Sequence, residues 1–192
     1  MRYFSIAAAT LFSAFLTLAA SAAFDIGPPV GSTAPELKAL DTAGRPIKLA
    51  DIVGKSGVVV AFVRSAAWCP FCQKQMIDLK AAQAPLAQRG YTLAALSYDS
   101  PMVLAAFSRK QEIGYYLLSD EKSAIIDAFG IRDPQYPPES KAHGVPMPGI
   151  FIIDAKGVVR AKLAEEGYKV RPPVDAIIEA VGNLSLTANQ VQ

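Results

Sequence analysis

The fold of this chain is decided by residues 58–72, which read VVVAFVRSAAWCPFC. The first part, Val58–Val63, is an unbroken apolar run rich in β-branched residues, typical of a strand buried on both faces of a sheet. The second part, Trp68–Cys72, places two cysteines three positions apart, directly before a helical pattern that runs from Phe71 to Arg89. The stretch therefore predicts a central strand, a short loop and a dithiol at the beginning of a helix.

Outward from this stretch, the patterns of strands and helices alternate. Within the helix at 71–89, Pro85 predicts a kink, and Gly90 ends the helix. Ser100 and Pro101 supply an N-cap and a first-turn proline for another helix. The other expected elements are strands at 37–40, 47–49, 91–98, 117–118, 150–153 and 158–163, and helices at 101–112, 123–129 and 174–181. Together they predict an α/β domain, with a mixed central sheet flanked by helices and an N-terminal β-hairpin extension.

Composition narrows the possible functions. The 192 residues, 52% of them hydrophobic, fit one globular domain with a short appendage and exclude a disordered chain. Lys and Arg number 19 against 17 Asp and Glu, without a long basic run, so a nucleic-acid partner is not expected. Two cysteines and one histidine cannot build a disulfide-rich scaffold or a histidine-dominated metal site, and no cofactor is expected.

Residues 1–23 have the pattern of a secretory signal peptide. Arg2 precedes an apolar stretch, and Ala20-Ser21-Ala22 offers the small residues that a signal peptidase requires. An uncleaved anchor is the alternative, although the stretch is short for a membrane span. We therefore expect a periplasmic or secreted protein without stable membrane insertion after cleavage, consisting of a domain at 24–184 and a flexible tail at 185–192.

The dithiol is the informative chemical motif. At a helix start, the sulfur of Cys69 lies beside unpaired N–H groups and the positive end of the helix dipole, which favour thiolate and make it the attacking sulfur. Cys72, one turn further, can resolve a mixed disulfide on Cys69, and Pro70 and Phe71 tune the redox potential. An inert structural disulfide is one alternative. Half of a zinc site is another, but zinc needs two more ligands and only His143 remains.

Residues 62–72 resemble the active-site segment of thioredoxin-like redoxins, in the alkyl hydroperoxide reductase/thiol-specific antioxidant (AhpC/TSA) branch. The resemblance continues in the blocks VGSTAP (30–35), SYDS (97–100), LLSD (117–120), FGI (129–131) and PGIFIID (148–154), and it covers about residues 30–182. It implies a thioredoxin-like fold, a redox-active Cys69–Cys72 disulfide and an antioxidant oxidoreductase.

The segment departs from the peroxiredoxin pattern of that branch. Those enzymes carry P-x-x-x-T/S-x-x-C, with a distant arginine that helps to position the peroxide. Counting back from Cys69 places Phe62 and Ala66 at the motif positions, and counting back from Cys72 places Ser65 and Cys69 there. Neither register satisfies the motif.

Other positions resemble thioredoxins. Pro148 stands where the peroxiredoxin arginine is expected and resembles the cis-proline that packs against a dithiol and helps to bind substrate. The sequence leaves open whether the Met147–Pro148 bond is cis or trans. Trp68 before the first cysteine is also thioredoxin-like, and it is interpreted as a cover over the sulfurs or a packed aromatic. Ala61, however, replaces the buried carboxylate of thioredoxins.

The remaining charged candidates have competing interpretations. Arg64 can hold the thiolate by its charge, or it can be a surface arginine paired with a carboxylate. His143 is interpreted as an exposed loop residue, with metal binding as the alternative. Glu165-Glu166 and Lys169–Arg171 are interpreted as solvated charges.

Three functions follow from these residues. The first is a thiol–disulfide oxidoreductase that exchanges Cys69–Cys72 with protein thiols and disulfides. The second is a thiol-dependent peroxidase, with Cys69 as the peroxidatic and Cys72 as the resolving cysteine, served by a hydroperoxide and a thiol electron donor. The third is a Cu(I) chaperone that uses both thiolates and His143. The active-site segment favours the first.

Overall fold

The computed structural model describes residues 24–189, with the backbone alone for residues 187–189. The expected signal peptide at 1–23 and the last three residues of the expected tail lie outside the described residues. The strands are β1 (Lys38–Leu40), β2 (Pro46–Lys48), β3 (Gly57–Phe62), β4 (Tyr91–Ser97), β5 (Tyr116–Ser119), β6 (Gly149–Asp154) and β7 (Val159–Leu163). The helices are α1 (Leu49–Ile52), α2 (Pro70–Asp78), α3 (Lys80–Gln88), α4 (Pro101–Gln111), α5 (Ala124–Ala128) and α6 (Val174–Asn189).

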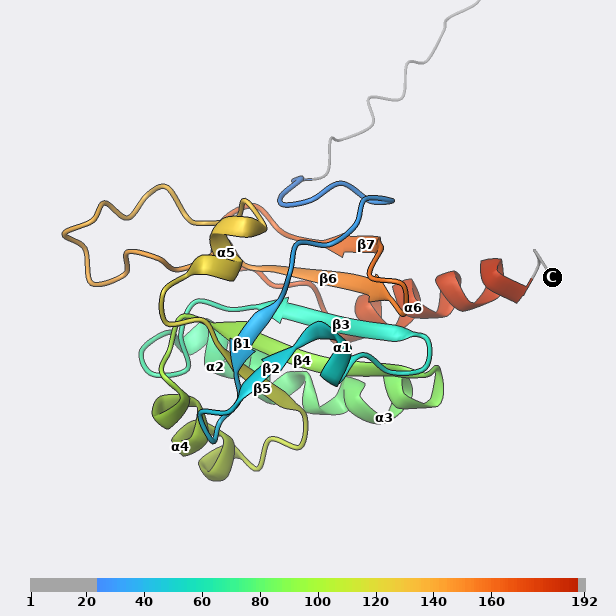
Figure 1. The fold of residues 1–192 in the computed structure, drawn as a ribbon, viewed down its shortest axis with the longest axis horizontal. Coiled ribbons are helices and arrows are strands. Elements are labelled where there is room, and N and C mark those ends of the chain that lie inside the picture. Colours follow the sequence, from blue (N-terminus) through green and yellow to red (C-terminus); the bar gives the residue numbers. More distant parts are fainter. Residues whose placement is uncertain (1–23, 190–192) are drawn as a thin grey trace, which may run out of the picture.

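Within the described residues the strands form one mixed sheet in the order β2-β1-β5-β4-β3-β6-β7 (Figure 1). β3 is parallel to β4 and antiparallel to β6. All of its residues are buried, as the apolar run Val58–Val63 predicts. The predicted α/β architecture is confirmed.

Two antiparallel hairpins complete the sheet. The predicted N-terminal hairpin is β1–β2, and it joins the edge of the sheet where Leu40 pairs with Ser119 of β5. The predicted late hairpin is β6–β7, with Gly149 of β6 paired to Phe62 of β3. The start of β6 and the end of β3 therefore lie side by side, next to the loop that leads to the dithiol.

Helices cover both faces of the sheet. On one face, α2, α3, α4 and α6 pack on the central strands, and both cysteines belong to this core. On the other face, α1, α5 and the N-terminal segment form a second core. There the ring of Phe62 lies 4.7 Å from that of Phe129 and 5.5 Å from that of Phe151, measured between centroids. Such aromatic packing fixes the end of β3 immediately before the dithiol loop.

The helix expected at 71–89 is divided in two, and the break lies at Leu79 rather than at Pro85. A proline has no N–H to donate to the carbonyl of Ala81, and its ring crowds that carbonyl. The disturbance falls in the turn before the proline, where the N–H of Ala82 donates to Leu79 over a three-residue span at 3.0 Å. The predicted kink was therefore placed too late in the chain.

The last helix is longer than predicted. It runs to Asn189 instead of ending at Val181, so residues 185–189 of the expected tail are helical. The reason is an apolar stripe that continues past Val181, since Ile177, Val181 and Leu184 all pack in the first core.

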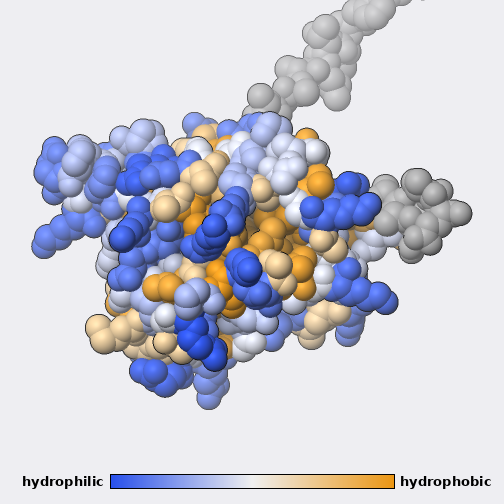
Figure 2. Space-filling view, viewed as in Figure 1, coloured by the Kyte–Doolittle hydropathy of each residue, from blue (hydrophilic) through white to orange (hydrophobic). Residues whose placement is uncertain are grey.

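The surface is largely hydrophilic in the view of Figure 2, where apolar side chains show mainly over the centre of the sheet. Among the described residues, no helix combines the length and apolar character needed to cross a membrane.

Candidate active site

The two cysteines lie at the beginning of α2, after the loop that follows β3, and they form a disulfide. Cys69 is the N-cap of α2, and its Sγ accepts the backbone N–H of Cys72 at 3.3 Å. Pro70 occupies the first turn, where a missing N–H costs nothing. Both cysteines are buried, at 2% and 0% exposure, so the oxidised pair lies beneath neighbouring side chains.

A buried carboxylate holds the loop between β3 and α2. Asp99 follows β4, whose end lies beside the end of β3 because the two strands are parallel. Its carboxylate accepts from the Ser65 hydroxyl at 2.7 Å, from the Ala66 N–H at 2.6 Å and from the Ser97 hydroxyl at 2.8 Å. Ser65 Oγ in turn accepts from the N–H of Ala67 at 3.0 Å. Asp99 thus fixes the chain that leads to the dithiol.

Arg64 is buried beside the dithiol, and no anionic group in the described part of the chain pairs with it. Its backbone N–H donates to Cys72 Sγ at 3.4 Å. Its guanidinium carbon lies between 4.3 and 5.3 Å from the ring centres of Trp68, Tyr136 and Tyr168, which are cation–π distances. Within residues 24–189 its Nε and Nη1 have no hydrogen-bond partner. The interpretation of a surface arginine paired with a carboxylate is therefore wrong.

A second guanidinium reaches the dithiol from the other end of the chain. Arg171 Nη2 lies 3.5 Å from Cys72 Sγ, and its Nε donates to Gln75 Oε1 at 2.8 Å. Burial, and to a lesser extent the charge of Arg64, lower the pKa of Arg171 to about 10, so it remains cationic at neutral pH. The interpretation of residues 169–171 as solvated charges is wrong for this arginine.

Arg171 belongs to residues 164–173, here called the strap, which connects β7 to α6. The ring of Tyr168 packs edge-on against Phe71, with 6.0 Å between centroids. In the described chain no backbone–backbone hydrogen bond involves residues 165–172, and residues 165–170 are exposed. The strap is therefore held mainly by side chains that contact the dithiol region.

Trp68 covers one side of the site, with 45% of its surface exposed. Its Nε1 donates to the Tyr98 hydroxyl at 2.9 Å, and the two rings pack edge to face. The Tyr98 hydroxyl donates to the Lys141 carbonyl at 3.2 Å, and burial raises the pKa of Tyr98. Trp68 is thus both a cover and a packed aromatic, two roles that do not exclude each other.

The sequence of this chain is similar to one known protein family and to several known proteins. Residues 30–162, more than half of the chain, match the AhpC/TSA family. The chain belongs to the AhpC/TSA family. It is 27% identical over 159 residues to the putative peroxiredoxin bcp of Haemophilus influenzae, covering 81% of this chain and 97% of the relative. It is 29% identical over 133 residues to peroxiredoxin Bcp of Escherichia coli, covering 67% and 81%.

Peroxiredoxin bcp1 of Schizosaccharomyces pombe is 32% identical over 105 residues, and this match spans 55% of the AhpC/TSA chain and 53%, about half, of the yeast protein. Among solved structures, a mutant of peroxiredoxin 6 from Arenicola marina has a TM-score of 0.75 at 20% identity, covering 84% of this chain and 76% of that one. Peroxidoxin BcpB of Mycobacterium tuberculosis has a TM-score of 0.68 at 21% identity, covering 85% and 98%. The fold is thioredoxin-like, and the chain is a peroxiredoxin-like oxidoreductase.

In this AhpC/TSA protein the residue directly before β6, where the peroxiredoxin arginine was expected, is Pro148. Pro148 is buried at the start of the strand, and every peptide bond described is trans, Met147–Pro148 included. The chain enters β6 extended, with the Met147 N–H bonded to Ile131 at 2.7 Å, and a trans bond is the lower-energy isomer there. Arg171, which lies beyond the residues that match the family, supplies a guanidinium at the dithiol instead.

His143 lies apart from this chemistry, and it is half-buried rather than exposed as expected. Its Nδ1 is 2.9 Å from the Tyr136 carbonyl, and its Nε2 is 3.1 Å from Arg132 Nη1, so the loop folds over the ring. Among the described residues, no three His, Cys, Asp or Glu side chains cluster in a way that could hold a metal ion. The Cu(I) chaperone hypothesis therefore has no support.

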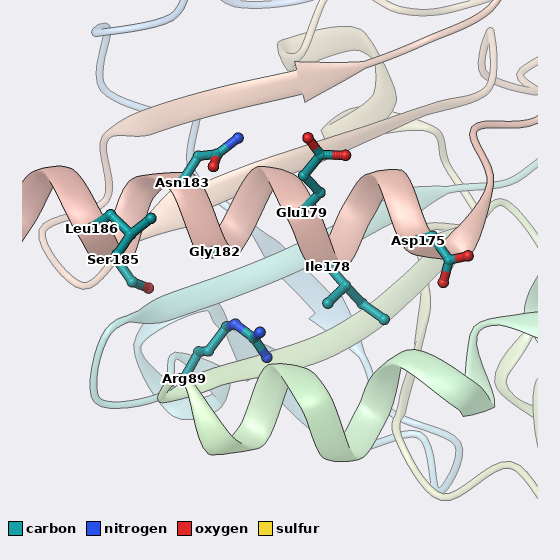
Figure 3. A pocket seen from close by; sticks show the side chains of 8 residues that line it. All are labelled: Arg89, Asp175, Ile178, Glu179, Gly182, Asn183, Ser185 and Leu186. Carbon is teal, nitrogen blue, oxygen red and sulfur yellow. The ribbon is translucent and has the colours of Figure 1, made fainter.

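A separate pocket of about 600 Å³ lies between the end of α3 and helix α6. Figure 3 shows Arg89 at the end of α3, with Ile178 and Ser185 on the facing helix. No residue of the dithiol site lines it, so we assign it no part in the chemistry.

Three site residues, Asp99, Arg171 and Tyr168, were not predicted from the sequence. Asp99 carried a signal, because a polar residue that follows a strand parallel to the central one reaches the same sheet edge. Arg171 and Tyr168 carried none, since they lie in an irregular segment and Arg171 is 99 positions from Cys72.

Proposed function

We propose that this AhpC/TSA protein is a thiol-dependent peroxidase, which reduces a hydroperoxide with Cys69 and Cys72 and is itself reduced by a thiol donor. Its relatives from H. influenzae and E. coli are named as peroxiredoxins. The observation that carries the proposal is the positive charge at the dithiol. The Arg171 guanidinium lies 3.5 Å from Cys72 Sγ, the buried Arg64 gives its backbone N–H to the same sulfur, and neither arginine forms an ion pair within residues 24–189.

In the proposed reaction the Cys69 thiolate attacks one oxygen of the hydroperoxide. The O–O bond breaks, Cys69 becomes a sulfenic acid, and the alcohol leaves after taking up a proton. The Cys72 thiolate then attacks the Cys69 sulfur, the disulfide forms, and the hydroxyl leaves as water with a second proton. Two donor thiols finally reduce the disulfide to two thiols and become a donor disulfide, which balances the two electrons given to the peroxide.

The charges around the sulfurs support this reaction. Cys69 Sγ sits at the positive end of α2, which favours its thiolate. Cys72 Sγ receives the Arg64 N–H and faces the Arg171 guanidinium, which stabilise a second negative charge nearby. Guanidinium donors can also bind the peroxide oxygens as charge develops on them. They would take over the task of two groups found in other peroxiredoxins, the threonine or serine of the P-x-x-x-T/S-x-x-C pattern and the distant arginine.

Stopped-flow oxidation of the pre-reduced protein tests this proposal. Trp68, the only tryptophan of the chain, directly precedes Cys69 and reports the reaction by its fluorescence. We expect one hydroperoxide consumed per disulfide formed, no reaction in Cys69→Ser, and a sulfenic acid that dimedone traps in Cys72→Ser. Oxidation no faster than that of free cysteine at the same pH would refute the proposal.

A second candidate function is disulfide exchange with protein substrates. The observation that favours it is the exposure of two rings beside the disulfide, 45% for Trp68 and 38% for Phe71, because exposed aromatics suit a partner chain. Reduction of insulin by the dithiol, and capture of proteins as mixed disulfides on Cys69 in Cys72→Ser, would support it.

We further propose that the mature chain works in the periplasm or is secreted. The support is the sequence of residues 1–23, with its apolar stretch and small residues before a cleavage point near Phe24. Cell fractionation followed by N-terminal sequencing tests this. A protein found in the cytoplasm with Met1 still attached to the leader would contradict it.

A further inference from the structure

We propose that the pocket between α2 and the strap binds the carboxylate of a small thiol, which acts as the electron donor to the Cys69–Cys72 disulfide. The inference rests on the proposed function, because a peroxidase needs an electron donor, and it adds the chemical class of that donor. The pocket has a volume of about 240 Å³, and among its walls are Arg171 of the strap and Gln75 of α2.

The first observation is the charge of the pocket. Lys74, Lys169 and Arg171 line it, against a single acidic residue, Asp78. Asp78 is already paired with Lys74 at 2.6 Å. In the described chain Lys169 and Arg171 form no ion pair. Two cations are thus left without an anion in a pocket that is otherwise partly apolar, with walls that include Phe71.

The second observation is an unpartnered donor. Gln75 is 5% exposed, and its Oε1 accepts from Arg171 Nε at 2.8 Å. Its Nε2 has no hydrogen-bond partner among the described residues. A buried donor without an acceptor destabilises the folded protein, because it has lost its hydrogen bonds to water. A carboxylate oxygen placed between Gln75 and Arg171 would satisfy this donor and pair with the guanidinium in a charge-assisted bond.

The third observation is the link between the pocket and the disulfide. Arg171 lines the pocket and its Nη2 lies 3.5 Å from Cys72 Sγ, so a carboxylate bound to Arg171 is separated from the disulfide by a single guanidinium group. The structure shows the oxidised pair, which is the form that a reducing thiol meets. In the described chain no backbone–backbone hydrogen bond involves residues 165–172 of the strap, and its Tyr168 and Val170 carbonyls accept from Arg171 of the strap itself. The strap can therefore move aside to admit the thiol.

The step balances as an ordinary thiol–disulfide exchange. The donor thiolate attacks Cys69 Sγ, a mixed disulfide forms, and Cys72 leaves as a thiolate between the Arg64 N–H and Arg171. A second donor thiolate attacks the donor sulfur of the mixed disulfide, and Cys69 leaves. Two donor thiols are oxidised to one donor disulfide, the protein pair gains two electrons, and the protons lost by the donors are available to the protein thiols.

Reduction of the oxidised protein by three thiols of similar size tests the proposal. Mercaptoacetate is anionic, 2-mercaptoethanol is neutral and cysteamine is cationic. Each rate, followed by Trp68 fluorescence, is divided by the rate of the same thiol with a small uncharged disulfide, which removes differences in thiol reactivity. We expect the normalised rate of mercaptoacetate to exceed that of cysteamine about tenfold or more, to saturate with concentration, and to be inhibited by propionate.

Lys169→Gln and Lys156→Gln form a matched pair of variants. Both remove one exposed positive charge, but Lys156 lies in the β6–β7 turn, at the end of β6 away from the dithiol. We expect Lys169→Gln to lose much of the preference for mercaptoacetate without slowing 2-mercaptoethanol, and Lys156→Gln to keep it.

Equal normalised rates for the three thiols would overturn the proposal. So would a preference that does not saturate, or that the two variants lose equally, because net charge would then explain it. The assay contains no peroxide, so its outcome is independent of the peroxidase test.

Discussion

Asp99 is the residue whose loss should most disturb the dithiol loop. Three hydrogen bonds end on its buried carboxylate, and Ser65 and Ala66 of the loop supply two of them. We expect Asp99→Ala to lower the free energy of unfolding by about 3 kcal/mol, since buried partners of a charged acceptor are left unpaired.

Urea denaturation measures this loss. Asp78→Ala is the control, because Asp78 is half exposed and pairs only with Lys74 across one helical turn, an arrangement worth at most about 0.5 kcal/mol. If both variants lose the same small amount, Asp99 does not anchor the loop.

Arg171 is the residue that brings charge to the dithiol from outside the family segment. We expect Arg171→Gln to slow peroxide oxidation about 10–100-fold, because one group that balances negative charge at the sulfurs is removed. The pH midpoint for alkylation of the reduced pair should rise at the same time. The rate of Arg171→Lys should lie between the rates of the natural protein and Arg171→Gln. Lysine keeps the positive charge but lacks the guanidinium that donates to Gln75.

Arg109→Gln, at an exposed site on α4, is the control for loss of one charge. A purely structural role for Arg171 would lower stability without moving the alkylation midpoint. An unchanged pH profile in Arg171→Gln would therefore contradict the electrostatic role.

At the scale of single elements, the carboxylate of Asp120 binds the N-terminus of helix α5, and its titration makes the stability of the protein depend on pH. Asp120 accepts the N–H groups of Ile125 and Ile126 at 2.9 and 3.0 Å, yet burial outweighs these bonds and raises its pKa above 3.8. The native state therefore binds this proton more tightly than the unfolded state. Its contribution to stability is greatest when Asp120 is protonated and is lost as pH rises from 3.8 through the raised native pKa.

Asp120→Asn keeps an acceptor for the helix N–H groups and removes the titration. We expect the stability of the variant, relative to the natural protein, to increase as pH rises from acid to neutral. Urea denaturation over this range measures it, and a difference that stays flat or decreases would show that burial does not dominate at Asp120.

We expect the strap to control access to the sulfurs, because its Tyr168 and Arg171 contact the dithiol region. In Tyr168→Ala it loses an edge-on contact with Phe71 and a cation–π contact with Arg64, each worth about 0.5–1 kcal/mol. We expect dithiothreitol to reduce the disulfide about fivefold faster or more, because opening of the strap becomes easier. Tyr116→Ala, an exposed tyrosine on β5, should leave the rate unchanged, and equal rates in all three proteins would show that the strap is no barrier.

The elements could be predicted where a local pattern defines them. The run Val58–Val63, the N-cap Ser100 and the hairpin around residues 154–157 all lie where expected, since each depends on neighbours in sequence. The break was expected at Pro85, which stays inside α3, and it lies at Leu79, six residues earlier. The end of α6 was misplaced because packing, not composition, extends the helix.

At the scale of the whole molecule, the site is an assembly of distant segments. The parallel strands β3 and β4 bring the dithiol loop and Asp99 to one edge of the sheet, and the strap adds Arg171. The cysteines were predictable because their spacing alone carries the chemistry. The surrounding charges were not predictable. They meet only when the sheet has formed and the strap, which follows β7, has packed beside the dithiol.

The central claim is that this dithiol meets a hydroperoxide rather than a protein disulfide. A competition measures it directly: the reduced protein is mixed with hydrogen peroxide and insulin at equal concentrations of peroxide and disulfide, and the consumption of each is followed together. We predict that peroxide is consumed first, with formation of the Cys69–Cys72 disulfide while insulin stays oxidised. Reduction of insulin ahead of peroxide would contradict the claim.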